Sequence, residues 1–395
     1  MLRAVVDGFV SPGLEPVQES FERTFAQGKE LGAAVALYRG TEPLVDLWGG
    51  FRDVAATRPW ERDTMVLVLS TTKGIAGLTV ALANSRGLLD YEEPVATYWP
   101  EFAQNGKGEI TMRQLLSHQA GLPAVDEKLD ANVLGDLDRM ASILARQRPA
   151  WKPGTRHGYH ALSLGWYENE LIRRVDPSHR SIGRFFHEEI AVPLELDFHI
   201  GLPSDVPESR IAEIDGFTSP QMARHMNVMP AGMVLAYVWP RSLVARTMGN
   251  PRLHSPADIN RPEYRRVEWP AGNGIGTVRS IAKAYAVFAS GGRELALRRE
   301  TLRALEEPTL RPSGGTRDMI LKVETRFSMG FMKPFPSFRF GSNGRAYGTP
   351  GMGGSFGFAD PDTGVGFAYA PNRHGFHVWD DPREKPLRDV AFSCL

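Results

Sequence analysis

Two residues three positions apart, Ser70 and Lys73, form the part of this sequence that most directly suggests chemistry. A serine hydroxyl becomes an effective nucleophile only when a base removes its proton. A lysine amine can be that base when it is neutral, which requires burial or a neighbouring cation. The Ser-x-x-Lys spacing therefore indicates nucleophilic catalysis by Ser70 with Lys73 as its partner.

The residues around this pair predict how it is positioned. An apolar, β-branched run from Val66 to Leu69 leads into Ser70, and small and apolar residues continue to Gly87, a natural C-terminal stop. A helix that starts at Ser70 places Lys73 one turn later on the same face. Backbone N–H groups that are free at a helix start would suit a developing oxyanion.

The motif is short, and a chain of this length contains one or two copies by chance at average residue usage. A second copy is present at Ser280 and Lys283. We expect Ser280 to begin a helix and Lys283 to be solvated, so that this copy has no catalytic role.

Composition limits the classes of protein to consider. The 395 residues are enough for a large core and two lobes, and 46 basic residues balance 46 acidic ones, which gives no support for a nucleic-acid partner. The single cysteine, Cys394, excludes an intrachain disulfide and fits a reducing compartment. The segment Met1–Gly8 has no apolar signal-peptide core, and no stretch reaches the length of a membrane span. We therefore expect a cytoplasmic protein.

Strand patterns occur at both ends of the chain and helical patterns in the middle, which favours an α+β fold. We expect a sheet domain built from residues 1–78 and 262–395, and a helical domain of residues 79–261 that covers the active site. The predicted strands are residues 32–38, 43–48, 328–331, 345–347, 355–359 and 365–370. The predicted helices include residues 15–28, a helix capped by Thr111, residues 131–148, residues 161–175, a helix that ends at Ala289 and a C-terminal helix from about Pro382.

Five segments occur in an order that resembles the serine β-lactamase and penicillin-binding-protein superfamily, and within it the β-lactamase-like (family VIII) carboxylesterases. They are Leu69–Lys73, Leu115–Leu122, Pro153–Thr155 with Tyr159, Gly272–Thr277 and Gly351–Phe358. The resemblance covers nearly the whole chain. It implies the β-lactamase/transpeptidase-like fold, an antiparallel sheet flanked by the N- and C-terminal helices, with an inserted, mostly helical domain.

The resemblance also implies roles for individual residues. Ser70 matches the acylated nucleophile, Lys73 its lysine partner, and Tyr159 the tyrosine that passes a proton to the leaving alkoxide. A phenol needs nearby cations to act as a phenolate, and Lys73 could be one. The N–H groups of Ser70 and Met352 would form the oxyanion hole.

The sequence departs from the β-lactamase pattern at two positions that read the substrate. Tyr159 is followed by His160 and Ala161, so the usual side-chain amide is absent. Thr349, Pro350 and Gly351 stand where the family has Lys-Thr-Gly or His-Thr-Gly, so the cation that holds a β-lactam carboxylate is missing. We expect Thr349, Gly351, Gly353 and His160 to line the substrate cleft, and the substrates to be neutral esters.

A competing nucleophile is Ser355, in the Gly-x-Ser-x-Gly segment Gly353–Gly357. An α/β-hydrolase elbow requires a helix after the serine, whereas Phe356-Gly357-Phe358-Ala359 alternates like a strand. Only 40 residues follow Ser355, too few for the rest of that fold. We expect Ser355 to lie on a strand beside the cleft.

We therefore expect a serine carboxylesterase that acts through an acyl-Ser70 intermediate on a small-molecule ester, with no metal or organic cofactor. The alternatives are an acyltransferase that uses the same acyl-enzyme, a weak β-lactamase, and a penicillin-binding-like sensor with a dead site. A metallohydrolase is disfavoured because the ten histidines show no metal-binding spacing. Homo-oligomerisation is left open.

Overall fold

The computed structural model describes residues 5–252 and 256–395. The first four residues of the Met1–Gly8 segment therefore lie outside the described residues. Among the described residues, no helix is both long enough and apolar enough to cross a membrane.

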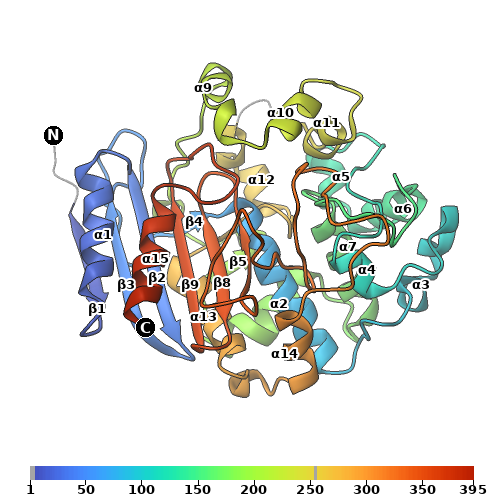
Figure 1. The fold of residues 1–395 in the computed structure, drawn as a ribbon, viewed down its shortest axis with the longest axis horizontal. Helices are drawn as coiled ribbons and strands as arrows, with labels where there is room; N and C mark the ends of the chain where they lie inside the picture. Colours follow the sequence, from blue (N-terminus) through green and yellow to red (C-terminus); the bar gives the residue numbers. More distant parts are fainter. Residues whose placement is uncertain (1–4, 253–255) are drawn as a thin grey trace.

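A six-stranded antiparallel sheet joins the two ends of the chain (Figure 1). Its strands, in the spatial order β1-β3-β2-β9-β8-β7, are β1 (Val6–Val10), β3 (Glu42–Gly50), β2 (Gly32–Arg39), β9 (Val365–Pro371), β8 (Phe356–Asp360) and β7 (Tyr347–Pro350). Strands β2 and β9 pair from Ala33 opposite Pro371 to Arg39 opposite Val365. This pairing places β7, at one edge of the sheet, beside the helical part of the chain.

Strand β2 is buried on both faces because helices cover both sides of the sheet. Val35 and its alternate neighbours pack in one core with α1 (Glu15–Ala26) and α15 (Glu384–Cys394). Ala34 and Ala36 belong to the other core, which includes α13 (Val278–Ala289). The alternation follows the two-residue period of a strand. It confirms the predicted antiparallel sheet flanked by N- and C-terminal helices.

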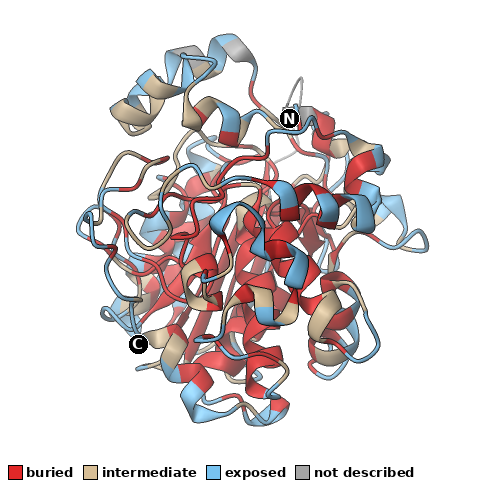
Figure 2. Ribbon diagram, turned by 90° about the vertical axis from the view of Figure 1, so that its right-hand side faces the viewer, coloured by how far each residue is buried: buried red, intermediate tan, exposed pale blue. Residues whose placement is uncertain are grey.

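Helix α2 (Thr72–Ser85) runs through the centre of the molecule, and each of its residues is buried. Because other parts of the protein cover α2 on every side, the helix needs no polar face. Its single charged residue is Lys73. In Figure 2, buried residues are concentrated along the central helices and strands, and the exposed ones lie at the periphery.

Shorter elements complete the fold around α2. A three-stranded sheet consists of β4 (Val66–Leu67), β6 (Gly274–Gly276) and β5 (Phe198–Ile200). The remaining α-helices are α3 (Val95–Tyr98), α4 (Met112–Leu116), α5 (Ala131–Gly135), α6 (Leu137–Arg146), α7 (Leu164–Val175), α8 (Ile182–Phe186), α9 (Ser219–Arg224), α10 (Ala231–Tyr237), α11 (Leu243–Met248), α12 (Pro262–Arg266) and α14 (Arg299–Glu306).

Most predicted elements occur, and Thr111 caps α4 in a full capping box with Gln114. The helix expected over residues 131–148 is divided, because Asp136 leaves the helical conformation and its side chain caps α6 through the N–H of Arg139. The prediction of a strand at residues 328–331 was wrong. A turn with Gly330 at φ 85° replaces it, flanked by a bridge between Phe327 and Met332.

Candidate active site

Ser70 lies in a short 3₁₀ turn, Leu69–Thr71, between β4 and α2. Leu69 has φ 44°, an uncommon conformation for a residue with a side chain, so the surrounding contacts must hold the turn in place. The N–H of Val68 donates to the carbonyl of Gly274 at 3.0 Å. The N–H of Gly274 in turn donates to the hydroxyl of Thr72 at 2.8 Å. The serine is therefore fixed between β6 and the start of α2.

Lys73 points from the first turn of α2 toward this serine. Its Nζ atom lies 2.9 Å from Oγ of Ser70 and donates to the carbonyl of Ala271 at 2.7 Å. The side chain is fully buried, and burial lowers the pKa of Lys73 to about 7, against an opposing effect of Glu168. Part of the lysine population is thus neutral near physiological pH, as a general base requires.

Tyr159 lies next to the same two residues. Its ring centroid is 5.1 Å from Nζ of Lys73, and its hydroxyl interacts with Ser70. Burial raises the pKa of Tyr159, and the hydrogen bond with Ser70 opposes this only in part. Burial thus keeps Tyr159 a neutral phenol, which is suited to donate a proton and not to act as the initial base. Lys73 is close to Tyr159 but does not make it a phenolate.

The backbone of Tyr159 is held by Asp318, a residue that the sequence analysis missed. The N–H of Tyr159 lies 3.2 and 3.0 Å from the two carboxylate oxygens of Asp318. The same carboxylate accepts hydrogen bonds from the N–H groups of Ile320 and Leu321. Asp318 is 159 residues from Tyr159 in the chain, and no local pattern signals the contact.

Ser355 braces the nucleophile turn from the neighbouring strand. Its hydroxyl donates to the carbonyl of Val68 at 2.8 Å and lies 3.0 Å from the hydroxyl of Thr71. Its neighbour Phe356 begins strand β8, so Ser355 does not occupy the strand-to-helix elbow of an α/β-hydrolase. Ser355 is 6% exposed, and its hydrogen bonds indicate a positioning role.

The glycine-rich turn after β7 lies against the turn that carries Ser70. Its N–H at Gly351 donates to the carbonyl of Ser355 at 2.7 Å, and a Cβ at Gly351 would lie 2.6 Å from the carbonyl of Val68. Only glycine allows this approach. Met352 follows and is 46% exposed. Gly353, with φ 94°, is held by Arg383, whose guanidinium donates to its carbonyl at 2.8 Å.

Two residues expected in the substrate cleft are placed elsewhere. His160 is fully buried, accepts a hydrogen bond from the N–H of Leu122 at Nε2, and contacts the carbonyl of Gly158 with Nδ1. Both ring nitrogens thus bond the backbone, so His160 supports the loop and does not line the cleft. Thr349 is 2% exposed and its side chain faces Gly74 of α2, so its hydroxyl also points into the interior.

The second Ser-x-x-Lys copy lies on a different helix, α13. Ser280 lies in the first turn of α13, where its hydroxyl accepts a hydrogen bond from the N–H of Asp197 and contacts the hydroxyl of Thr277. These bonds give Ser280 a structural role near the start of the helix, as expected, whereas Lys283 is half-buried and not fully solvated.

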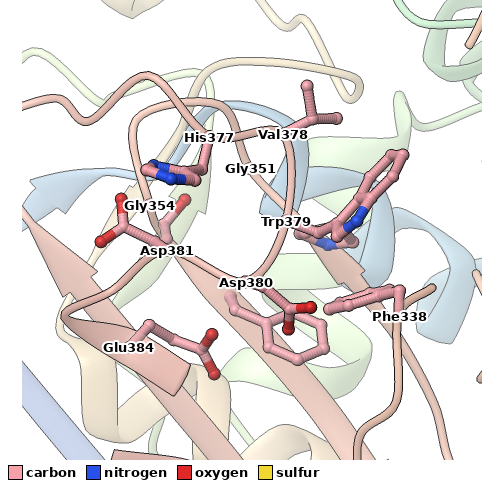
Figure 3. Close-up of a pocket in the computed structure, with 12 residues that line it drawn as sticks. Phe338, Gly351, Gly354, His377, Val378, Trp379, Asp380, Asp381 and Glu384 are labelled. Atoms are coloured by element: carbon pink, nitrogen blue, oxygen red, sulfur yellow. The ribbon is translucent and has the colours of Figure 1, made fainter. Parts of the chain in front are cut away.

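Figure 3 shows a pocket that the glycine-rich turn lines in part. Gly351, Gly354 and Ser355 line it together with the C-terminal segment His377–Asp381, whereas Ser70, Lys73 and Tyr159 do not. Its carboxylates are already paired, Asp381 with Arg383 and Glu384 with Arg388. Within residues 5–252 and 256–395, no group of three or more His, Cys, Asp or Glu side chains could hold a metal ion.

Comparison with known proteins identifies the family to which the chain is similar. A family model described as "Beta-lactamase" matches residues 17–391. The esterase/beta-lactamase LipL of Mycobacterium tuberculosis is 32% identical over 377 residues, which cover 93% of this chain and 83% of LipL. The crystal structure of a family VIII carboxylesterase superposes with a TM-score of 0.87 at 36% identity, covering 99% of this chain and 100% of that one. A penicillin-binding-protein homologue from Caulobacter crescentus gives a TM-score of 0.85 at 35% identity, covering 99% and 100%.

Proposed function

The chain belongs to the beta-lactamase family and is a serine carboxylesterase of the beta-lactamase-like type, and we propose that it cleaves short, neutral carboxylic esters through an acyl-Ser70 intermediate. One observation carries the residue assignment. The fully buried amine of Lys73 lies 2.9 Å from the hydroxyl of Ser70, with its pKa lowered to about 7. This is the arrangement that activates a serine without a histidine.

The proposed reaction has two stages. Neutral Lys73 takes the proton of Ser70 as Oγ attacks the ester carbonyl, and the oxyanion is held by the N–H groups of Ser70 and Met352. The phenol of Tyr159 gives its proton to the leaving alkoxide and regains one from Lys73. Water then attacks the acyl-enzyme, the same groups transfer its proton, and the acid leaves.

The inferred preference for neutral esters depends on which side chains near β7 could bind a substrate carboxylate. Thr349 stands where the resemblance implies a lysine or histidine, and its side chain is buried. Arg345, the nearest arginine before it in the sequence, pairs with Glu306 and Asp362. We infer that a substrate carboxylate finds no strong partner at this end of the cleft.

A screen of p-nitrophenyl esters by acyl-chain length, with and without an alcohol acceptor, tests the proposal. We expect the highest kcat/KM for short acyl chains and a rate of nitrophenol release that the alcohol leaves nearly unchanged. Formation of a new ester as the main product would instead identify an acyltransferase. Turnover confined to β-lactams would contradict the proposal.

A further inference from the structure

Helix α7 carries a carboxyl group in an unusual environment. Glu168 is fully buried, and neither of its carboxyl oxygens has a hydrogen-bond partner among the described residues. Glu170, two residues later and 4% exposed, is paired as buried carboxylates usually are. Arg173 and Arg174 donate to its carboxylate at 2.8 and 2.6 Å. Burying an unpartnered carboxyl destabilises a fold, so its presence calls for a role outside folding.

The position of Glu168 relative to α2 indicates that role. Helices α2 and α7 pack against each other. A Cβ at Gly330 would lie 3.4 Å from both Oε1 of Glu168 and Cα of Gly77. Gly77 is one helical turn after Lys73 and shares its face of α2. The carboxyl thus lies near Gly77, one helical turn along α2 from the catalytic lysine, in space left by Gly330; the space beside Gly77 itself is filled by the ring of Phe331.

The ionisable groups around the pair are few. Lys73 and Tyr91 are the groups that interact electrostatically with Glu168. Lys73 is faced by Glu168, Tyr159 and His118. Burial raises the pKa of both tyrosines and lowers the pKa of His118, so these three groups are neutral near pH 7. Glu168 is therefore the group around Lys73 whose charge can change in this range.

Burial acts on the two partners in opposite directions. It raises the pKa of Glu168 to about 8, against the effect of Lys73, and lowers the pKa of Lys73 to about 7, against the effect of Glu168. The groups therefore titrate as a coupled pair near neutral pH, and one proton is distributed between a carboxyl and an amine.

Resting on the acyl-transfer function above, we propose that Glu168 is a positioning residue that sets the protonation state of Lys73. When Glu168 holds the proton, Lys73 is the free amine that can activate Ser70. When Glu168 is a carboxylate, it favours the ammonium form of Lys73, which cannot accept the proton of Ser70. The reactive state thus contains a neutral acid and a neutral amine, both buried in the core.

Replacement of the carboxyl gives a directional test. Glu168→Gln cannot ionise, so Lys73 loses the anion that favours its ammonium form. We expect the acid limb of the kcat/KM profile for a p-nitrophenyl ester to move to lower pH by about half a unit or more. Glu168→Asp, which can still ionise, should keep its midpoint nearer to that of the wild type. Glu170→Gln is the matched control on the same helix. It removes the charge that pairs with Arg173 and Arg174 and should leave the midpoint unchanged.

A second variant keeps the test valid if Glu168→Gln does not fold. Glu168→Met has similar length and no polar atom, so the protein should fold, and its acid limb should shift in the same direction. An active Gln or Met variant whose midpoint stays at the wild-type value, or moves to higher pH, would overturn the proposal. Failure of both variants to fold would also overturn it, because the carboxyl would then be indispensable to the fold.

The pH dependence of fluorophosphonate labelling at Ser70 reports the same titration without an ester substrate. It separates this inference from the proposed function. Labelling that follows the predicted shift, in a protein that hydrolyses no ester, would retain the role of Glu168 and reject the esterase. Hydrolysis with unshifted profiles would retain the esterase and reject the role of Glu168.

Discussion

The N–H of Tyr159 lies within hydrogen-bond distance of both carboxylate oxygens of Asp318, at 3.2 and 3.0 Å. This contact fixes the loop from which the Tyr159 ring reaches Ser70 and Lys73. Asp318 also accepts hydrogen bonds from two further N–H groups, so one buried side chain holds three backbone donors. The position of the proton donor in the active site therefore depends on a residue that does not contact substrate.

Removal of this anchor should affect both stability and rate. Asp318→Ala leaves buried N–H groups without partners, each of which costs about 1–3 kcal/mol. We expect a lower urea midpoint and a lower kcat with p-nitrophenyl acetate. Asp318→Asn keeps one acceptor oxygen, so its urea midpoint and kcat should lie between those of the wild type and those of Asp318→Ala. Wild-type stability and kcat in Asp318→Ala would show that Tyr159 is held by other contacts.

Lys73 and Tyr159 should behave as one unit. Lys73→Ala removes the base, and Tyr159→Phe removes the donor to the leaving group, so each variant should impair acylation strongly. Since the proton passes between them, the double variant should be little worse than the poorer single variant. Stopped-flow measurement of the nitrophenol burst checks this. Wild-type acylation by Tyr159→Phe would make Tyr159 structural.

Ser355 should prove dispensable for the chemistry. Ser355→Ala loses the bonds to Val68 and Thr71 that brace the nucleophile turn, but no proton-transfer group. Turnover should stay within about tenfold of the wild type, a loss of no more than ~1.4 kcal/mol in activation free energy. Ser280→Ala, at the other serine motif, is the control. A folded but inactive Ser355→Ala enzyme would conflict with this account.

β-Lactams should be poor substrates. The acylation groups are present, so nitrocefin can react slowly, but the partner for its carboxylate is missing. A charge-assisted hydrogen bond contributes about 1.5–3 kcal/mol, or one to two decades in binding. With the missing amide at Ala161 as well, kcat/KM for short p-nitrophenyl esters should exceed that for nitrocefin by at least about a hundredfold. Comparable values for the two would point to another cation in the cleft.

Features encoded locally were predictable from the sequence. The Ser-x-x-Lys spacing fixes the relation of Ser70 to Lys73 through one helical turn, and Thr111 begins α4 as its capping pattern predicts. The strand after Ser355 follows from its period-two alternation. Each of these depends on residues a few positions apart, where backbone geometry alone decides the outcome.

Features that depend on contacts distant in sequence were not predictable. The carboxyls of Asp318 and Glu168 contact segments that are distant in sequence and meet them only in the folded chain. His160 adjoins Tyr159 in sequence and was assigned to the cleft, but its ring turns to the backbone of Leu122 and Gly158. Sequence adjacency to a catalytic residue does not determine the direction of a side chain.

Identification of the acylated residue tests the central claim most directly. The protein is treated with a fluorophosphonate, digested, and examined by tandem mass spectrometry, with Ser70→Ala treated in parallel. Ser70→Ala should also lose about a million-fold in kcat, as expected for a serine nucleophile. We expect a single adduct on Ser70 and none in the variant. An adduct on Ser355, or labelling that persists in Ser70→Ala, would contradict it.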